Sequence, residues 1–113
     1  MRQLLEGIRY LHEEKSVCHR DVKPDNIIVS EKVRVDGGKS YRLKLCDFNV
    51  AKNFNHKTMM TKTGLEEWSA PEMVGGAQYT CKIDLWSVGC VLYFMLTGEK
   101  PFSSQNLARL YHQ

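Results

Sequence analysis

The feature of this sequence that most constrains its fold is the run from Leu85 to Leu96, whose side chains are apolar on nearly every side of a helix. A helix that is hydrophobic all round is a buried one. Gly98 stands just past the run and Pro101 follows shortly after it, which together make an ordinary helix stop. The pattern predicts a buried helix that begins near Asp84 and ends before Gly98.

A second helix is predicted at the start of the sequence. Apolar residues recur there at helical spacing between charged and polar ones: Leu4, Leu5, Ile8 and Leu11. This amphipathic helix is expected to end near Lys15. The pattern is already running at the first residue with no N-cap before it, and a further amphipathic segment opens over residues 106–113. We therefore expect both ends of the sequence to lie within helices, as in a fragment of a larger domain.

The middle of the sequence predicts β-structure. Residues 27–29, Ile-Ile-Val, are expected to form a short buried strand. Residues 32–35 and 41–46 flank Asp36-Gly37-Gly38, a strong hairpin signal because glycine adopts the positive φ that tight turns need. Residues 49–66 are polar, show no sustained period and are expected to form a long functional loop. Together with the helices, these segments predict an α+β fold.

Length and composition limit the chain to one ordinary globular domain at most. The 113 residues are 42% hydrophobic and 26% charged, as in a foldable protein and unlike a disordered tail. The net charge of +3 is small and the basic residues are scattered among acidic ones, so no nucleic-acid-binding stripe stands out. The apolar run from Val88 to Leu96 is too short and too interrupted to span a bilayer. We expect neither nucleic acid nor a membrane among the partners.

The sequence has four cysteines, which stand singly in apolar surroundings: Cys18, Cys46, Cys81 and Cys90. None of them forms a pair at two-residue spacing, and no secretory leader precedes them. A zinc site built from Cys18, His19 and His56 is the alternative, but its spacing matches no known ligand pattern. Free thiols in a reducing compartment fit best, so a cytoplasmic or nuclear protein is expected.

Residues 19–26, His-Arg-Asp-Val-Lys-Pro-Asp-Asn, combine carboxylates, a lysine, an amide and a rigid turn within one short run. A purely structural role rarely requires this combination of residue types. Asp47-Phe48-Asn49 and Ala70-Pro71-Glu72 follow it in order, and then residues 84–89 with an aspartate, a tryptophan, a serine and a glycine. Each motif alone is weak, but in this order they strongly resemble the catalytic core of eukaryotic protein kinases of the serine/threonine type.

The resemblance implies transfer of a phosphoryl group from ATP to a hydroxyl of a protein substrate. That reaction needs an aligned nucleophile and positive charge around the phosphates. The resemblance makes Asp21 the catalytic base and Lys23 the cation at the γ-phosphate. Asn26 and Asp47 become ligands of Mg²⁺, for which amide and carboxylate oxygens are suited. Ile28 is expected beneath the adenine ring.

The resemblance also implies a regulatory device. Arg20 looks like the arginine through which many kinases read phosphorylation of their activation segment, because a phosphate there would pair with it in a bidentate manner. Counting back from Gly64, as the family's pattern suggests, makes Thr61 the first choice of phosphorylation site. Thr58 and Thr63 are weaker candidates.

Supporting roles follow from the same resemblance. His19 and Phe48 are expected to belong to a stacked apolar spine. Asp84 is expected to hydrogen-bond the backbone of the catalytic loop, a contact that fixes the geometry phosphoryl transfer needs. Glu72 is expected to pair with an arginine that lies beyond Gln113.

The chain departs from the family's pattern at Asn49 and Leu65. Asn49 stands where glycine is usual, and asparagine tolerates left-handed backbone angles, so metal binding through Asp47 is expected to survive. Leu65 stands where a threonine usually bonds to the residues that match Asp21 and Lys23. Leucine cannot make that bond, which favours the alternative of a pseudokinase or a non-catalytic interaction module.

The resemblance covers residues 1–113 as part of a kinase domain, from the end of the family's helix E to the start of its helix G, with the catalytic loop, metal-binding triplet, activation segment and helix F between them. No glycine-rich phosphate loop and no strand lysine is present; both would lie upstream of Met1. The chain is thus expected to be a mostly helical C-terminal lobe with a small β-hairpin, to lack the N-terminal lobe and to be inactive alone. Residues 1–12 and 98–102 look most like calcium/calmodulin-dependent-type kinases.

Overall fold

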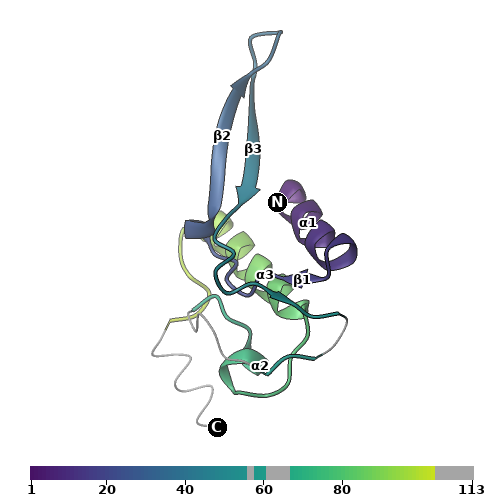
Figure 1. The fold of residues 1–113 in the computed structure, drawn as a ribbon. Coiled ribbons are helices and arrows are strands. Elements are labelled where there is room, and N and C mark those ends of the chain that lie inside the picture. Colours follow the sequence, from purple (N-terminus) through teal and green to yellow (C-terminus); the bar gives the residue numbers. More distant parts are fainter. Residues whose placement is uncertain (56–57, 61–66, 104–113) are drawn as a thin grey trace.

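The computed structural model describes residues 1–55, 58–60 and 67–103. Helices and small antiparallel sheets follow one another along the chain, so the α+β class is confirmed. Figure 1 shows the helices gathered in the body of the molecule and a hairpin projecting from it. The elements in chain order are α1 (Arg2–Arg9), the π-helix η1 (Tyr10–Glu14), β1 (Val17–Cys18), the 3₁₀-helix η2 (Pro24–Asn26), β2 (Ile27–Val33), β3 (Lys39–Leu45), β4 (Lys52–Asn53), α2 (Pro71–Val74) and α3 (Lys82–Thr97).

The predicted N-terminal helix is present, and its last turn is wider than an α-helical turn. α1 buries Leu4 and Ile8 on its inner face. In η1, which continues it, the amide of Lys15 donates to the carbonyl of Tyr10 at 3.3 Å, the hydrogen bond of a π-helix. Such wide turns are frequent at functional sites, and this one carries His12.

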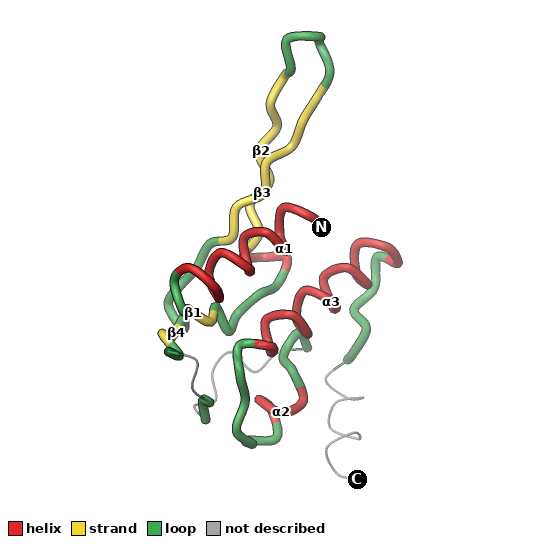
Figure 2. Tube along the Cα trace, turned by 90° about the vertical axis from the view of Figure 1, so that its right-hand side faces the viewer, coloured by secondary structure: helices red, strands yellow, loops and turns green. Residues whose placement is uncertain are grey.

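The predicted hairpin is present. β2 pairs with β3 from Ile27↔Leu45 at the base to Val33↔Lys39 near the tip. Gly37 in the connecting turn has a φ of +81°, the positive angle for which a glycine is suited. Both views show this hairpin extending away from the helices (Figures 1 and 2).

The expectation of a separate buried strand over residues 27–29 is wrong. These residues begin β2, and Ile28 and Val29 are 51% and 58% exposed. The apolar side chains that pack on the main cluster come from the hairpin's base and one face: Ile27, Leu43 and Leu45. An apolar run of this length therefore marked strand structure correctly but not its burial, because only one face at one end of the hairpin meets the helices.

The predicted apolar helix is α3, and Gly98 ends it with a φ of +76°. Its expected burial on every side is wrong. Val88 and Val91 are buried, whereas Leu85, Tyr93 and Leu96 are 49%, 45% and 78% exposed. One face packs on α1 and the loops, and the described residues do not cover the other face. No described helix is long and apolar enough to cross a membrane.

Hydrophobic side chains form two clusters, of which one contains Val22 and the other contains Cys18, the residue before the run 19–26. The first joins α1 to α3 and consists of Leu4, Ile8, Val22, Trp68, Val88, Cys90 and Val91. The second lies around α2 and the start of α3 and consists of Cys18, Phe54, Met59, Ala70, Met73, Tyr79 and Ile83. Burial in these clusters is the main stabilising contribution to the described fold.

The expected long loop over residues 49–66 contains short pairings that its polar composition did not indicate. β4 pairs with β1 through Val17↔Asn53 and Cys18↔Lys52. Met59 forms an isolated bridge with Tyr79, with backbone hydrogen bonds of 2.7 and 2.8 Å. The described parts of the loop are therefore fastened to the strand before residue 19 and to the segment before α3.

Replacement by alanine should change the free energy of unfolding in opposite directions at Gly89, within α3, and at Gly98, at its end. Gly98→Ala is expected to lower the free energy of unfolding by about 1 kcal/mol, because a Cβ is strained at positive φ. Gly89→Ala is expected to raise it by about 0.5–1 kcal/mol, because a Cβ there meets no atom within 4 Å and alanine favours helix. Urea denaturation followed by circular dichroism measures both changes. Equal effects of the two variants would contradict the left-handed helix end.

Candidate functional site

The run of residues 19–26 is anchored just before its first residue and in its middle. Cys18, the residue before it, is fully buried in the cluster around Met73 and Ile83. Val22, in its middle, is 1% exposed in the cluster of α1 and α3. The polar side chains between these anchors are therefore presented from a backbone with little freedom to shift.

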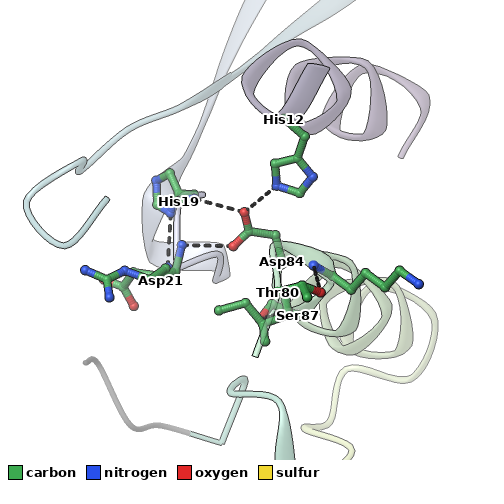
Figure 3. A network of polar contacts seen from close by, with 9 residues as sticks. His12, His19, Asp21, Thr80, Asp84 and Ser87 are labelled. Atoms are coloured by element: carbon green, nitrogen blue, oxygen red, sulfur yellow. Dashed lines mark hydrogen bonds and ion pairs between the residues drawn. The ribbon is translucent and has the colours of Figure 1, made fainter. Parts of the chain in front are cut away.

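Asp84 joins this run to the first turn of α3, as Figure 3 shows. Its side chain is 1% exposed. Its Oδ2 accepts a hydrogen bond from the backbone amide of His19, and its Oδ1 accepts one from that of Arg20, both at 2.9 Å. A buried carboxylate is tolerated only with such partners, so the structure places Asp84 where it orients the backbone of the run.

His12 completes this buried network from the opposite side. Its Nε2 lies 2.7 Å from Oδ2 of Asp84, and the π-helical turn η1 carries the ring toward α3 (Figure 3). Sequence reasoning did not single out His12, because its partner lies far along the chain. A histidine within the polar side of a predicted helix has no local signal for such a contact.

The His19 ring is wholly buried and links two of the motifs. Its Nε2 donates to the carbonyl of Cys46 at 2.9 Å, and its Nδ1 accepts from the amide of Asp21 at 3.2 Å. This pair of bonds assigns the ring proton to Nε2. The ring also meets Phe48 edge to face, with centroids 4.9 Å apart, so the structure brings together the two residues expected to stack.

Asp21, Lys23 and Asn26 converge within this framework. The side-chain amide of Asn26 donates to the carbonyl oxygen of Asp21 at 2.8 Å and to its Oδ2 at 3.0 Å. The ammonium of Lys23 lies 3.6 Å from Oδ1 of the same carboxylate. Asp21 is therefore held in one orientation, with an amide on one oxygen and a cation near the other.

The base of the hairpin brings the backbone before Asp47 to that of Asn26. The amide of Cys46, its neighbour, donates to the carbonyl of Asn26 at 2.8 Å. Asp47 is exposed and has a φ of +60°, whereas Asn49, where left-handed geometry was expected to be tolerated, has no positive φ. Instead the amide of Asn49 donates to Oδ1 of Asp47 at 3.3 Å. The strain thus falls on the expected ligand itself.

The side chains of Asn26 and Asp47 fit a magnesium ion chemically. Both bonds of the Asn26 amide nitrogen are donated to Asp21, which leaves its Oδ1 as an acceptor. Oδ2 of Asp47 makes no hydrogen bond within the described residues. An amide oxygen and a carboxylate oxygen are the hard ligands that Mg²⁺ prefers.

Arg20 reaches from the run to two later segments. Its Nε donates to the carbonyl of Val50 at 2.7 Å, and its guanidinium also donates to the hydroxyl of Tyr79 at 3.1 Å. Its φ is +66°, a left-handed conformation that costs a non-glycine residue about 1–2 kcal/mol. The bonds that Arg20 donates to Oδ1 of Asp84 and to the carbonyl of Val50 hold it in this conformation.

The remaining expected site residues occupy separate positions. Ile28 is exposed as the second residue of β2. Glu72 is partly buried in the first turn of α2, and no described residue bonds its carboxylate. Thr58 is exposed. Outside the described residues lie His56, Thr61, Thr63, Gly64, Leu65 and residues 106–113.

The zinc alternative finds little support in the geometry. Both ring nitrogens of His19 are used by backbone partners. The described residues that bring ligand atoms within 4.8 Å of one another are His12, Cys18 and Asp84. Burial, with a smaller effect of the nearby Asp84, raises the pKa of the Cys18 thiol, which disfavours the thiolate form that binds zinc.

Comparison with known proteins gives the class of this chain. A family model described as "Protein kinase domain" matches residues 1–113, and the chain belongs to that family. It is 44% identical over 105 residues to "Serine/threonine-protein kinase chk-2" of Caenorhabditis elegans, covering 91% of this chain and 21% of that protein. It is 39% identical over 112 residues to "Probable myosin light chain kinase" of Dictyostelium discoideum, covering 98% of this chain and 22% of that protein. The chain spans about a fifth of the length of these relatives.

Proposed function

We propose that residues 1–113 belong to a protein kinase that transfers the γ-phosphoryl group of ATP to serine or threonine hydroxyls of proteins. The observation that carries the proposal is the Asp21 carboxylate, which lies 3.0 Å from the Asn26 amide nitrogen and 3.6 Å from the Lys23 ammonium. A base held in one orientation beside a cation suits in-line phosphoryl transfer. Membership of the protein kinase family supports the reaction class.

In this proposal one residue accepts the proton of the substrate hydroxyl, and the others stabilise the negative charge of the phosphates. Asp21 accepts a hydrogen bond from the substrate hydroxyl and takes its proton as the new oxygen–phosphorus bond forms and the bond to ADP breaks. Lys23 lies close enough to that carboxylate to interact with the transferred phosphoryl group. Asn26 and Asp47 would hold Mg²⁺, which neutralises phosphate charge when bound.

The nucleotide would lie against the base of the hairpin. Ile28 is half exposed two residues after Asn26, at which the 3₁₀-helix ends, and we propose that it packs beneath the adenine ring. The edge-to-face contact of His19 with Phe48 supports their proposed role as members of an apolar spine next to Asp47.

We propose that the chain is the C-terminal-lobe part of the kinase domain, from the end of helix E through helix F to the start of helix G. The uncovered apolar face of α3 supports this assignment. A hollow of about 220 Å³ between α1, the hairpin and α3 has an apolar lining that includes Ile27, Val91 and Met95. An exposed apolar face of this kind is normally buried against a further layer of structure. A separate N-terminal lobe would supply the glycine-rich loop and strand lysine, and residues 1–113 alone are proposed to be inactive.

Regulation and cellular setting extend the proposal. We propose that Arg20, whose side chain already donates to Val50 and Tyr79, binds a phosphate on Thr61. The carboxylate of Glu72, which no described residue bonds, would pair with an arginine beyond Gln113. The similarity of residues 1–12 and 98–102 to calcium/calmodulin-dependent-type kinases is our proposal for the subfamily. Four free thiols fit a cytoplasmic or nuclear protein.

A second candidate function is a pseudokinase or non-catalytic interaction module. The observation that favours it is Leu65, which cannot supply the hydroxyl that serine/threonine kinases usually have at this position. The retained Asp21, Lys23, Asn26 and Asp47 favour the enzyme, because a scaffold gains nothing from two carboxylates clustered near a lysine.

Metal removal separates the two candidates. We expect the full-length protein, given ATP labelled at the γ-phosphate and Mg²⁺, to transfer label to a mixture of protein substrates, and we expect EDTA to abolish transfer and excess Mg²⁺ to restore it. Phosphoamino-acid analysis should then find the label on serine and threonine. Absence of transfer by a protein with an unchanged circular dichroism spectrum would favour the interaction module, and label on tyrosine would contradict the hydroxyl specificity.

A further inference from the structure

The β2–β3 hairpin holds the net charge of the whole chain. Residues 27–45 contain five basic side chains against two acidic ones, an excess equal to the formal net charge of +3. The hairpin also projects from the body in both views (Figures 1 and 2), and the molecule extends 54 Å along its longest axis. A positive arm of this kind reaches partners before the rest of the surface does.

The strand register places part of this charge on a single face. Side chains of directly paired residues in an antiparallel sheet point to the same side. The pairs Ile28↔Lys44, Ser30↔Arg42 and Lys32↔Ser40 alternate with the pairs that pack at the base. We call the side formed by these six residues the basic face. Lys32, Arg42 and Lys44 lie on it, and all are exposed.

The cations of the basic face differ from the other cations of the hairpin. Lys39 pairs with Glu31 across the strands at 3.2 Å, and Arg34 pairs with Asp36 in the turn at 3.3 Å. No acidic side chain among the described residues pairs with Lys32, Arg42 or Lys44. The basic face is therefore the uncompensated part of the hairpin.

The spacing of these cations matches that of carboxylates along an extended acidic peptide. Arg42 and Lys44 are two residues apart on β3, and Lys32 lies opposite Ser40, a further two residues along. Alternate residues of an extended strand are about 6.6–7 Å apart. An extended peptide with carboxylates at alternate positions has the same repeat, and the hydroxyls of Ser30 and Ser40 lie between the cations as further hydrogen-bonding groups.

We propose that the basic face is a docking surface for an acidic, extended segment of a partner protein, with Asp or Glu at alternate positions. The face has no aromatic side chain on which bases could stack, and three cations are few for a nucleic acid contact. Its one apolar member, Ile28, lies at the base and not at the tip, which disfavours insertion into a lipid surface. The proposal goes beyond phosphoryl transfer and needs no catalytic activity.

The test compares two doubly substituted full chains of equal charge. Arg42→Gln/Lys44→Gln removes two cations of the basic face, and Arg34→Gln/Lys39→Gln removes two that already have acidic partners. The probe is a fluorescein-labelled peptide of alternating Asp and Ser, measured by fluorescence anisotropy at about 0.01 M ionic strength, where screening is weak. We expect Kd to rise about tenfold for the first variant, to stay within about twofold for the second, and to rise with added salt.

Further measurements distinguish an acidic peptide from other ligands of the basic face. Lys32→Gln should also weaken binding, and a peptide with the same residues in separate Asp and Ser blocks should bind less tightly than the alternating one. Equal loss in both double variants, or equal binding of the block peptide, would overturn the proposal. So would the absence of binding by a chain whose circular dichroism spectrum is intact. Tighter, Arg42-dependent binding of a single-stranded oligonucleotide or of vesicles containing phosphatidylserine would assign the face to that ligand instead.

Discussion

Replacing Asp21 with asparagine is expected to lower the rate of phosphoryl transfer by the full-length protein by about 10²–10⁴-fold, the usual contribution of a general base. Asparagine has nearly the same shape and keeps an oxygen that can accept the bond from Asn26, now 3.0 Å from Oδ2. It cannot take a proton from a hydroxyl at neutral pH. The loss should therefore fall on kcat, with little change in KM for ATP.

The control for this variant is Asp25→Asn. Asp25 is an exposed carboxylate in the 3₁₀-helix between Lys23 and Asn26, and its side chain makes no hydrogen bond within the described residues. Its replacement changes the charge of the same loop by the same amount, and activity should stay within about twofold, as for an exposed charge. Initial rates with saturating substrate measure both variants. Comparable activity of Asp21→Asn and the wild type would remove Asp21 from the chemistry and favour the non-catalytic module.

Asp84→Ala is expected to lower the free energy of unfolding by about 3–5 kcal/mol, as when one partner of a buried ionic contact is lost. The alanine leaves the amides of His19 and Arg20 and the ring of His12 without their acceptor in a buried setting. An unsatisfied buried donor costs about 1–3 kcal/mol. Since small domains are stable by only about 5–15 kcal/mol, much of the stability of the fold rests on this one carboxylate.

Urea denaturation followed by tryptophan fluorescence, to which the buried Trp68 and the partly exposed Trp86 both contribute, measures this change. Asp25→Ala is the matched control, because it removes an exposed carboxylate and should shift stability by no more than about 0.5 kcal/mol. Asp21→Asn should also leave stability nearly unchanged. A stable Asp84→Ala protein would mean that the run of residues 19–26 holds its shape without α3.

The sequence alone predicted the helices and turns that depend on residues close together along the chain. The helix near residue 1 and the hairpin around Gly37 followed from apolar spacing and from a turn that needs positive φ, and the end of α3 at Gly98 followed from the same chemistry. The order of the motifs was enough to predict the protein kinase family, which the family match confirms. Patterns of this kind depend on residues that are close together along the chain, so they can be recognised without the structure.

Features that depend on distant partners were not predicted or were predicted wrongly. β1 and β4 are too short to show a period, and they pair only because the chain returns from residue 53 to residue 17. α3 was expected to be buried all round, since composition cannot tell a face covered by the described chain from one that lies open. Asn49 was expected to tolerate a left-handed backbone, but the positive φ occurs at Asp47, whose Oδ1 accepts a hydrogen bond from the Asn49 amide.

The sequence by itself determined the class of the chain and the side chains available for chemistry, Asp21, Lys23, Asn26 and Asp47 among them. Only the tertiary structure decided how they are held: Asp84 and His12 meet across 72 positions of sequence, and the hairpin returns Cys46 to the backbone of Asn26. The register of that hairpin also gathers Arg42, Lys44 and Lys32 on one face. The physical reason is that hydrogen-bond partners and strand register follow from folding in three dimensions, whereas residue types and periods are already present along the chain.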